Sequence, residues 1–184
     1  KKVLEAKAMR GKDGPTLARA VLDILFGSPL AGPGLVKVDD AGRLLEAKPV
    51  VNVDMIGYGA SAYDHLKGDQ RIECYGINVS ERPTAKPPAG WPAFNKLRDQ
   101  LWWGAREFLK GGGTIPPKDG KLRADLLAVR LLQPTAAGNM QVEGKPEMKK
   151  RLGRSPDHGD AFCLCVYNPP PKPKIEVGHV NLRR

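Results

Sequence analysis

Two carboxylates and an imidazole stand close together near the carboxyl end of this sequence, directly after a run of basic residues. Asp157, His158 and Asp160 fall within four positions. The basic residues before them are Lys149, Lys150, Arg151 and Arg154. A spacing of three puts Asp157 and Asp160 on one face of a helix, near its N-terminus, where the helix dipole favours anions. A protein that holds a divalent metal against a phosphodiester needs both acidic groups and cations around them. The predicted helix start would supply both.

The helix that would carry these acids has a recognisable start. Ser155 is the expected N-cap, and Pro156 can occupy the first turn because its missing N–H has no partner there. The stretch 161–167 is apolar enough to form a buried helix. Cys163 and Cys165 lie two apart on it, and we interpret them as packing residues in preference to metal ligands.

A further carboxylate, Asp54, closes a compact apolar run over residues 49–54 that is typical of a central strand. In open α/β sheets, functional groups gather at the carboxyl ends of strands. Gly57 and Gly59 allow a tight strand-to-helix turn and a close approach of backbone to a phosphate. On this evidence Asp54 is either a functional carboxylate or a turn or capping residue. The Gly-x-Gly pair alone is a weak signal, since the rest of the dinucleotide fingerprint is missing.

The remaining elements follow from periodicity and turn chemistry. We expect strands at 2–9, 71–79 and 139–143, helices at 16–26, 94–109 and 122–132, and a peripheral hairpin at 35–46. Asp39 and Asp40 at the hairpin tip are interpreted as a solvated turn, although acids there could also bind metal. Trp102 and Trp103 are expected to be core and cap residues in preference to base-stacking platforms.

Composition sets wider bounds. A chain of 184 residues with 41% hydrophobic content suits one domain with an ordinary core, here 1–167, followed by a proline- and lysine-rich tail at 168–184. The net charge of +10 makes polyanions plausible partners without deciding the matter. Three cysteines without paired spacing argue against a disulfide framework. No apolar run is long enough to predict a membrane span.

Several motifs occur in a characteristic order. They are the strand ending in Asp54 with its glycine turn, Phe-Asn-Lys-Leu-Arg at 94–98, Thr-Ile-Pro at 114–116, Leu-Arg-Ala-Asp-Leu at 122–126, a lysine-rich run at 145–154 and Ser-Pro-Asp-His-Gly-Asp-Ala at 155–161. In this order the sequence resembles the nuclease domain of the large terminase subunits of tailed bacteriophages, the motor proteins of DNA packaging. The resemblance covers 1–167, and its most specific part is the lysine-rich run with Ser-Pro-Asp-x-x-Asp-Ala.

This resemblance implies a ribonuclease H-like α/β fold, with a central mixed sheet flanked by helices. It implies metal-dependent endonucleolytic cutting of double-stranded concatemeric DNA during packaging. Asp54 and Asp160 match the family's acidic positions and would be direct ligands of two Mg²⁺ or Mn²⁺ ions. Asp157 would be a ligand, an outer group or only a residue of the helix. His158 would assist proton transfer or position a phosphate, or would simply be an exposed histidine at a helix start.

The resemblance also leaves gaps. The family's first aspartate has no equivalent here, because 2–9 matches the second strand of the opening hairpin. The first strand is therefore expected upstream of Lys1, and the chain as given would cut weakly or not at all. The ATPase half is missing as well, since no G-x-x-x-x-G-K-[ST] motif occurs.

The basic residues and the partners complete the prediction. Lys145, Lys149, Lys150, Arg151 and Arg154 would contact the DNA backbone, unless they form only a solvated face. Phosphate contacts give affinity without sequence information. The resemblance implies double-stranded DNA, the portal and the small terminase subunit as partners, and the host cytoplasm as location. Two alternatives remain: another ribonuclease H-like nuclease, such as a Holliday-junction resolvase or a transposase-type enzyme, and a non-catalytic basic module that docks DNA or a portal ring.

Overall fold

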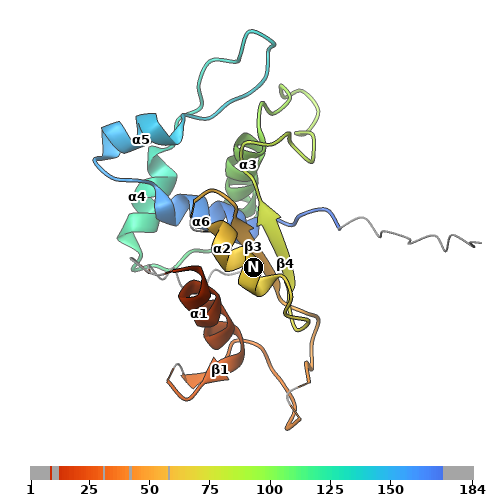
Figure 1. Ribbon diagram of the computed structural model, residues 1–184. Coiled ribbons are helices and arrows are strands. Elements are labelled where there is room, and N and C mark those ends of the chain that lie inside the picture. Colours follow the sequence, from red (N-terminus) through yellow and green to blue (C-terminus); the bar gives the residue numbers. More distant parts are fainter. Residues whose placement is uncertain (1–8, 10–12, 31, 42, 58, 172–184) are drawn as a thin grey trace, which may run out of the picture.

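The computed structural model describes residues 9, 13–30, 32–41, 43–57 and 59–171. The predicted strand at 2–9 lies outside this range except for Met9, and so do residues 172–184 of the predicted tail. The helices are α1 (Gly14–Phe26), α2 (Gly59–Leu66), α3 (Leu97–Lys110), α4 (Gly120–Ala128), α5 (Lys145–Leu152) and α6 (Asp157–Val166) (Figure 1). The strands are β1 (Gly27–Ser28), β2 (Gly32–Pro33), β3 (Val50–Asp54) and β4 (Glu73–Ile77).

The parallel pair β3–β4 lies at the centre of the molecule (Figure 1). Its register runs from Val50 beside Glu73 to Asp54 beside Ile77. Parallel neighbours need a crossover connection, and α2 supplies it. Over the described ranges the only other sheet is the short antiparallel pair β1–β2, so the expected mixture of strand directions in the central sheet is not seen there.

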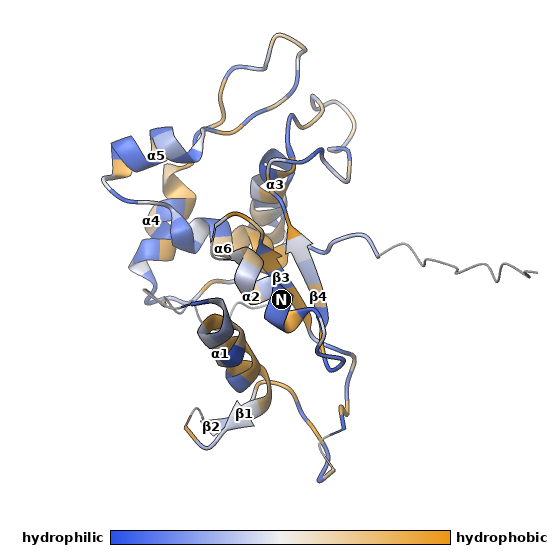
Figure 2. Cartoon of the chain, viewed as in Figure 1, coloured by the Kyte–Doolittle hydropathy of each residue, from blue (hydrophilic) through white to orange (hydrophobic). Residues whose placement is uncertain are grey.

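Two apolar clusters form the core. The smaller one packs α1 and α2 against β4 and contains Ala18, Leu66, Ile72 and Cys74. The larger one joins β4 to α3, α4, α5 and α6, with Ile77, Leu97, Leu101, Trp102, Ala105, Leu122, Met148, Phe162, Cys163 and Leu164. Figure 2 shows that α5 is hydrophilic along most of its length. Met148, which is fully buried, anchors this otherwise exposed helix.

The C-terminal end of α6 is tied to β3 by one side chain. The Nδ2 atom of Asn52 donates to the carbonyl oxygens of Leu164, at 2.8 Å, and Tyr167, at 2.9 Å. Since α6 contains Asp160 and β3 ends at Asp54, this amide joins the two elements that carry the predicted carboxylates.

Some predicted elements differ from those observed. The helix expected at 122–132 ends at Ala128, after which Val129 is extended and Leu131 forms an antiparallel bridge with Val142. The strand expected at 139–143 is present only as isolated bridges, and the hairpin at 35–46 as a single bridge between residues 38 and 44. Bridging to neighbouring backbone overrides the helical tendency of the leucines after Ala128.

The local predictions for the tryptophans and the acidic turn agree with the structure. Trp102 is a core residue at 5% exposure, and Trp103 packs edge-on against Trp91 with ring centroids 4.7 Å apart. Asp39 closes its turn by accepting from the backbone N–H groups of Ala41 and Arg43. No helix within the described ranges is long and apolar enough to cross a membrane.

Candidate functional site

A strand, a glycine turn and a helix fix the position of Asp54. Asp54 is the last residue of β3, and its Oδ1 atom accepts from the backbone N–H of Ile56 at 3.0 Å. Gly57 has φ +71°, a left-handed conformation that favours glycine. A Cβ atom on Gly59 would overlap the carbonyl oxygen of Asp54. Both glycines are therefore required by the tight turn that the sequence predicted.

The first turn of α6 fixes Asp160. The helix begins one residue later than predicted, with Pro156 in the N-cap position and no side-chain cap. Ser155 is therefore not the N-cap; its Oγ atom donates to Asp157 Oδ1 at 2.6 Å instead. The physical reason is distance along the chain: Ser155 stands one position too early for its hydroxyl to serve the free N–H groups of a helix that starts at Asp157.

Asp54 and Asp160 line the same pocket, which has a volume of about 330 Å³. The polar or charged residues beside them are Ser80, Lys96, Arg98 and Lys145. The rest of the lining is Ile56, Val79, Leu101, Trp102, Gly144, Pro146, Cys163 and Leu164. The fold thus brings two carboxylates that are far apart in the sequence into one concavity, together with three cations.

Lys145 and Arg98 balance the charge of Asp160. The Lys145 Nζ atom lies 3.0 Å from Asp160 Oδ2 and 3.2 Å from Asp157 Oδ1, and Arg98 Nη2 lies 3.9 Å from Asp160 Oδ1. Burial of the ammonium lowers the pKa of Lys145, but attraction to Asp160 and Asp157 outweighs it and leaves that pKa above its ordinary value. Lys145 is therefore a charged partner of both acids.

The other two predicted catalytic residues lie differently. The Asp157 side chain is 71% exposed, and the Asp157 pKa is lowered because the bonds from Ser155 and Lys145 outweigh the effect of burial. His158 turns toward α4, with its Nδ1 atom 3.3 Å from Asp119 Oδ2. Neither residue lines the pocket. Within the described part of the chain, no three His, Cys, Asp or Glu side chains stand close enough to hold a metal ion, so Asp157 does not join Asp54 and Asp160 in a cluster.

The five predicted DNA-binding residues divide into two groups. Lys149 and Lys150 are exposed on α5, and Lys145 opens into the pocket. Arg151 pairs with both carboxylate oxygens of Glu143 and donates to the Ala128 carbonyl oxygen at 2.6 Å. The Arg154 Nη1 atom lies 2.7 Å from Asp125 Oδ1. The two arginines hold acidic side chains of this domain, and the predicted phosphate contacts of all five residues stay predictions.

Lys96 and Arg98 also line the pocket, although the sequence did not mark them as site residues. Arg98 is held by donating to the Glu143 carbonyl oxygen at 2.7 Å, and its guanidinium lies 5.7 Å from the Trp102 ring centroid. The available signal was the alternation of basic residues in Asn-Lys-Leu-Arg at 95–98, which places two cations at the start of a helix.

The donor set suits a hard divalent cation. Two carboxylates offer oxygen ligands, which Mg²⁺ and Mn²⁺ prefer, and leave room for the waters that Mg²⁺ retains. Cys163 is the soft donor in the lining, and burial raises the pKa of its thiol well above the ordinary value. A thiol that stays protonated does not compete as a metal ligand.

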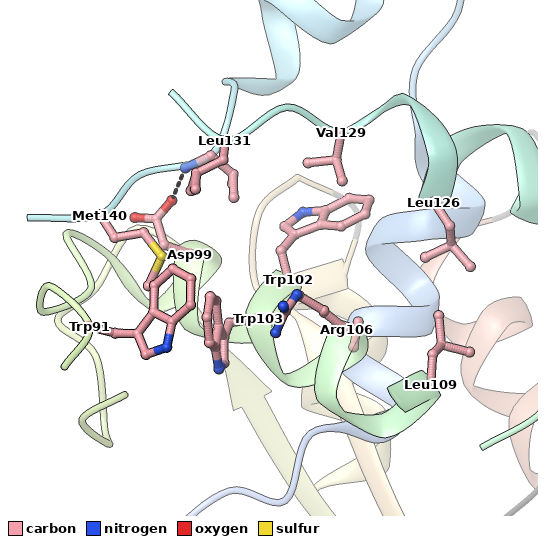
Figure 3. Close-up of a pocket in the computed structure, with 12 residues that line it drawn as sticks. Trp91, Asp99, Trp102, Trp103, Arg106, Leu109, Leu126, Val129, Leu131 and Met140 are labelled. Carbon is pink, nitrogen blue, oxygen red and sulfur yellow. Dashed lines mark hydrogen bonds between the residues drawn. The ribbon is translucent and has the colours of Figure 1, made fainter. Parts of the chain in front are cut away.

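A second pocket, of about 410 Å³, lies on another face of α3 (Figure 3). Trp91, Trp103, Leu131 and Met140 line it, and Trp102 borders both pockets. Its carboxylate, Asp99, accepts from the Val142 N–H at 2.8 Å and from the Lys96 N–H, so this group serves the fold. The pocket with Asp54 and Asp160 is therefore the better candidate for hydrolytic chemistry.

Comparisons with known proteins support the fold. No family model matches the sequence, and no curated protein does. Among solved structures, a lysine-to-alanine variant of the nuclease domain of the large terminase subunit gp2 of bacterial virus Sf6, with manganese and beta-thujaplicinol, matches with a TM-score of 0.54 and 21% identity. The match covers 66% of this chain and 66% of that one.

Two further structures of the same domain agree. The domain without the substitution gives a TM-score of 0.53 at 21% identity over 66% of each chain, and the variant with calcium gives 0.53 at 21% identity over 65% of each. At this level of identity the likeness concerns the fold, and the predicted ribonuclease H-like α/β class is confirmed. The chain has the fold of a terminase nuclease domain.

Proposed function

We propose that this chain is a divalent-metal-dependent endonuclease domain that cuts double-stranded viral DNA during genome packaging. The observation that carries the proposal is the shared pocket of Asp54 and Asp160, with cations around it. The likeness to terminase nuclease domains, studied with manganese and with calcium, supports both the reaction class and the type of metal. On the same likeness we further propose viral concatemeric DNA as the substrate, the portal and the small terminase subunit as partners, and the host cytoplasm as the location.

In this proposal Asp54 and Asp160 hold Mg²⁺ or Mn²⁺. A bound pair of such ions supplies an activated water and a stabilised leaving oxygen. The protein's contribution is to fix the two carboxylates, one by the glycine turn after β3 and the other by the first turn of α6. Lys145 keeps Asp160 oriented into the pocket through its 3.0 Å ion pair.

The cations of the site would bind the DNA backbone. Lys96, Arg98 and Lys145 face the pocket and would contact the phosphate to be cut. Lys149 and Lys150 on the exposed face of α5 would extend this contact along the duplex. Such contacts give affinity without base readout, as suits an enzyme that cuts wherever packaging stops.

Substitution of the ligand at the helix start tests the proposal. We expect Asp160→Asn to abolish Mn²⁺ binding, measured by titration calorimetry. In a protein extended to include the upstream strand, we expect it also to abolish Mn²⁺-dependent nicking of supercoiled plasmid. Asp64→Asn is the matched control, because Asp64 lies on the surface of α2 and pairs only with Lys67 among its described partners. Wild-type protein that binds no Mn²⁺ would contradict the proposed function. Unchanged binding and cleavage in Asp160→Asn would remove the role assigned to that residue.

A further inference from the structure

Asp125 is a fully buried acid on α4 that meets the first turn of α6. Its side chain is 0% exposed. The Oδ2 atom accepts from the Gly159 N–H at 3.0 Å, and the Oδ1 atom forms an ion pair with Arg154 at 2.7 Å, without the alignment of a hydrogen bond. One carboxylate therefore links α4, the turn before α6 and the backbone of α6 itself.

There is no room for a side chain at Gly159. A Cβ atom at this position would lie 2.7 Å from Trp102 Cη2 and 2.9 Å from Asp125 Cβ, closer than real Cβ contacts. The first turn of α6 therefore packs closely between the Trp102 indole of α3 and the Asp125 side chain of α4. The absence of a side chain at Gly159 is what allows the N–H to reach Asp125.

Arg154 and His158 fasten the same turn to α4. Arg154 donates to the carbonyl oxygens of Ser155, at 3.1 Å, and Lys121, at 3.4 Å. His158 contacts Asp119, whose Oδ1 atom accepts from the Leu122 N–H at the start of α4. The residues immediately before Asp160 are consequently held against one rigid helix.

We propose that Asp125 and Arg154 are positioning residues that set where the Asp160 carboxylate stands in the pocket. The inference rests on the proposed metal-binding role of Asp160. The Gly159 N–H belongs to the peptide unit that joins His158 to Gly159, one unit before Asp160. Both residues lie in the first turn of α6, so fixing this N–H restricts where the Asp160 backbone can lie. A buried ion pair is often no more stabilising than apolar packing of similar volume, so we infer that the role of this pair is to fix geometry. The same pair gives Arg154 a role inside the protein, beside the contact with DNA that the sequence predicted for it.

Metal binding without DNA tests this role. An asparagine at position 125 would turn its amide nitrogen toward either the Gly159 N–H or the Arg154 guanidinium, both of which are donors. We expect Asp125→Asn to weaken Mn²⁺ binding about tenfold by calorimetry, as for residues that orient metal ligands. Arg154→Met should weaken it similarly, whereas Arg154→Lys, which keeps a charge for Asp125, should recover most of the affinity.

A stability-matched control separates positioning from general damage. Ile72→Ala perturbs the smaller core cluster, which contains no residue of α6, and should lower Tm while leaving Mn²⁺ affinity within about twofold. All titrations are made well below the Tm of each variant. If Asp125→Asn fails to fold, the comparison of Arg154→Met with Arg154→Lys decides the question.

Two failures are distinguishable. If Asp160→Asn abolishes Mn²⁺ binding but Asp125→Asn and Arg154→Met bind like wild type, the positioning role is wrong and the proposed function stands. If wild type binds no Mn²⁺, or Asp160→Asn binds it normally, the proposed metal site fails and the positioning role falls with it.

Discussion

Asn52 offers the sharpest test of how the two carboxylate-bearing elements are joined. Its Nδ2 atom donates to the Leu164 and Tyr167 carbonyl oxygens, so Asn52→Ala removes both hydrogen bonds between β3 and the end of α6. No backbone rearrangement is needed to accommodate alanine. The loss of stability should therefore reflect these two bonds and the exposure of their acceptors.

The magnitude follows from opposing effects. Two hydrogen bonds contribute roughly 1–3 kcal/mol together. The Asn52 Oδ1 atom is buried without a hydrogen-bond partner among the described residues, so its removal offsets part of that loss. A neighbouring cavity of about 270 Å³, lined by Leu164 and Tyr167 among others, gives water access to the freed carbonyls. We expect a fall of about 2 kcal/mol in the free energy of unfolding, or about 4–8 °C in Tm for a domain of this size.

Urea unfolding followed by tryptophan fluorescence measures this change. Asn168→Ala, at an exposed asparagine just beyond α6, is the matched control and should change stability by less than about 0.5 kcal/mol. Asn52→Asp should be worse than Asn52→Ala at neutral pH, because a carboxylate would face two carbonyl oxygens. Its deficit should shrink as acid protonates that group and restores a donor.

A fall no larger than that of Asn168→Ala would refute the reasoning. So would an Asn52→Asp variant as stable as wild type at neutral pH. Either result would mean that α6 is held on β3 by apolar packing alone.

Two further predictions concern the turn after β3 and the acid limit of stability. Gly59→Ala should destabilise the domain by roughly 3 kcal/mol or more in the same urea assay, because its Cβ atom would overlap the Asp54 carbonyl oxygen. Gly68 has open space around it, so the control Gly68→Ala should change the free energy of unfolding by less than about 0.5 kcal/mol. Hydrogen bonds from Arg151 hold the pKa of Glu143 below its ordinary value. The stability that the ionised Glu143 gives the folded protein is therefore fully present above about pH 4.5 and is lost as pH falls through the lowered pKa. Glu143→Gln should therefore flatten the loss of stability between about pH 5 and pH 3, measured by urea unfolding across that range; an unchanged slope would contradict it.

Local chemistry was enough to predict the turn that presents Asp54. A β-branched run ending in a carboxylate, followed by Gly57 and Gly59, specifies strand, tight turn and helix within about ten residues. The same holds for the amphipathic face of α3, where Leu97, Leu101 and Ala105 recur at helical spacing. These features depend on residues that are neighbours in the sequence, so the sequence alone specifies them.

The basic run before α6 could not be resolved in the same way. Lys149, Lys150, Arg151 and Arg154 look equivalent in the sequence, but the fold gives the arginines buried acidic partners and leaves the lysines exposed. Those partners, Glu143 and Asp125, come from other segments. Only tertiary packing decides which cations are free, and the role of Arg98 in the pocket was missed for the same reason.

The attachment of α6 to β3 also bears on when the site comes into being. Asn52 is translated 112 residues before its acceptor Leu164 and 115 residues before its acceptor Tyr167. A nascent chain on the ribosome therefore contains Asp54 long before Asp160 can dock beside it. Assembly of the pocket therefore waits until the chain through Tyr167 has left the ribosome, and before that point Asp54 stands without its partner carboxylate.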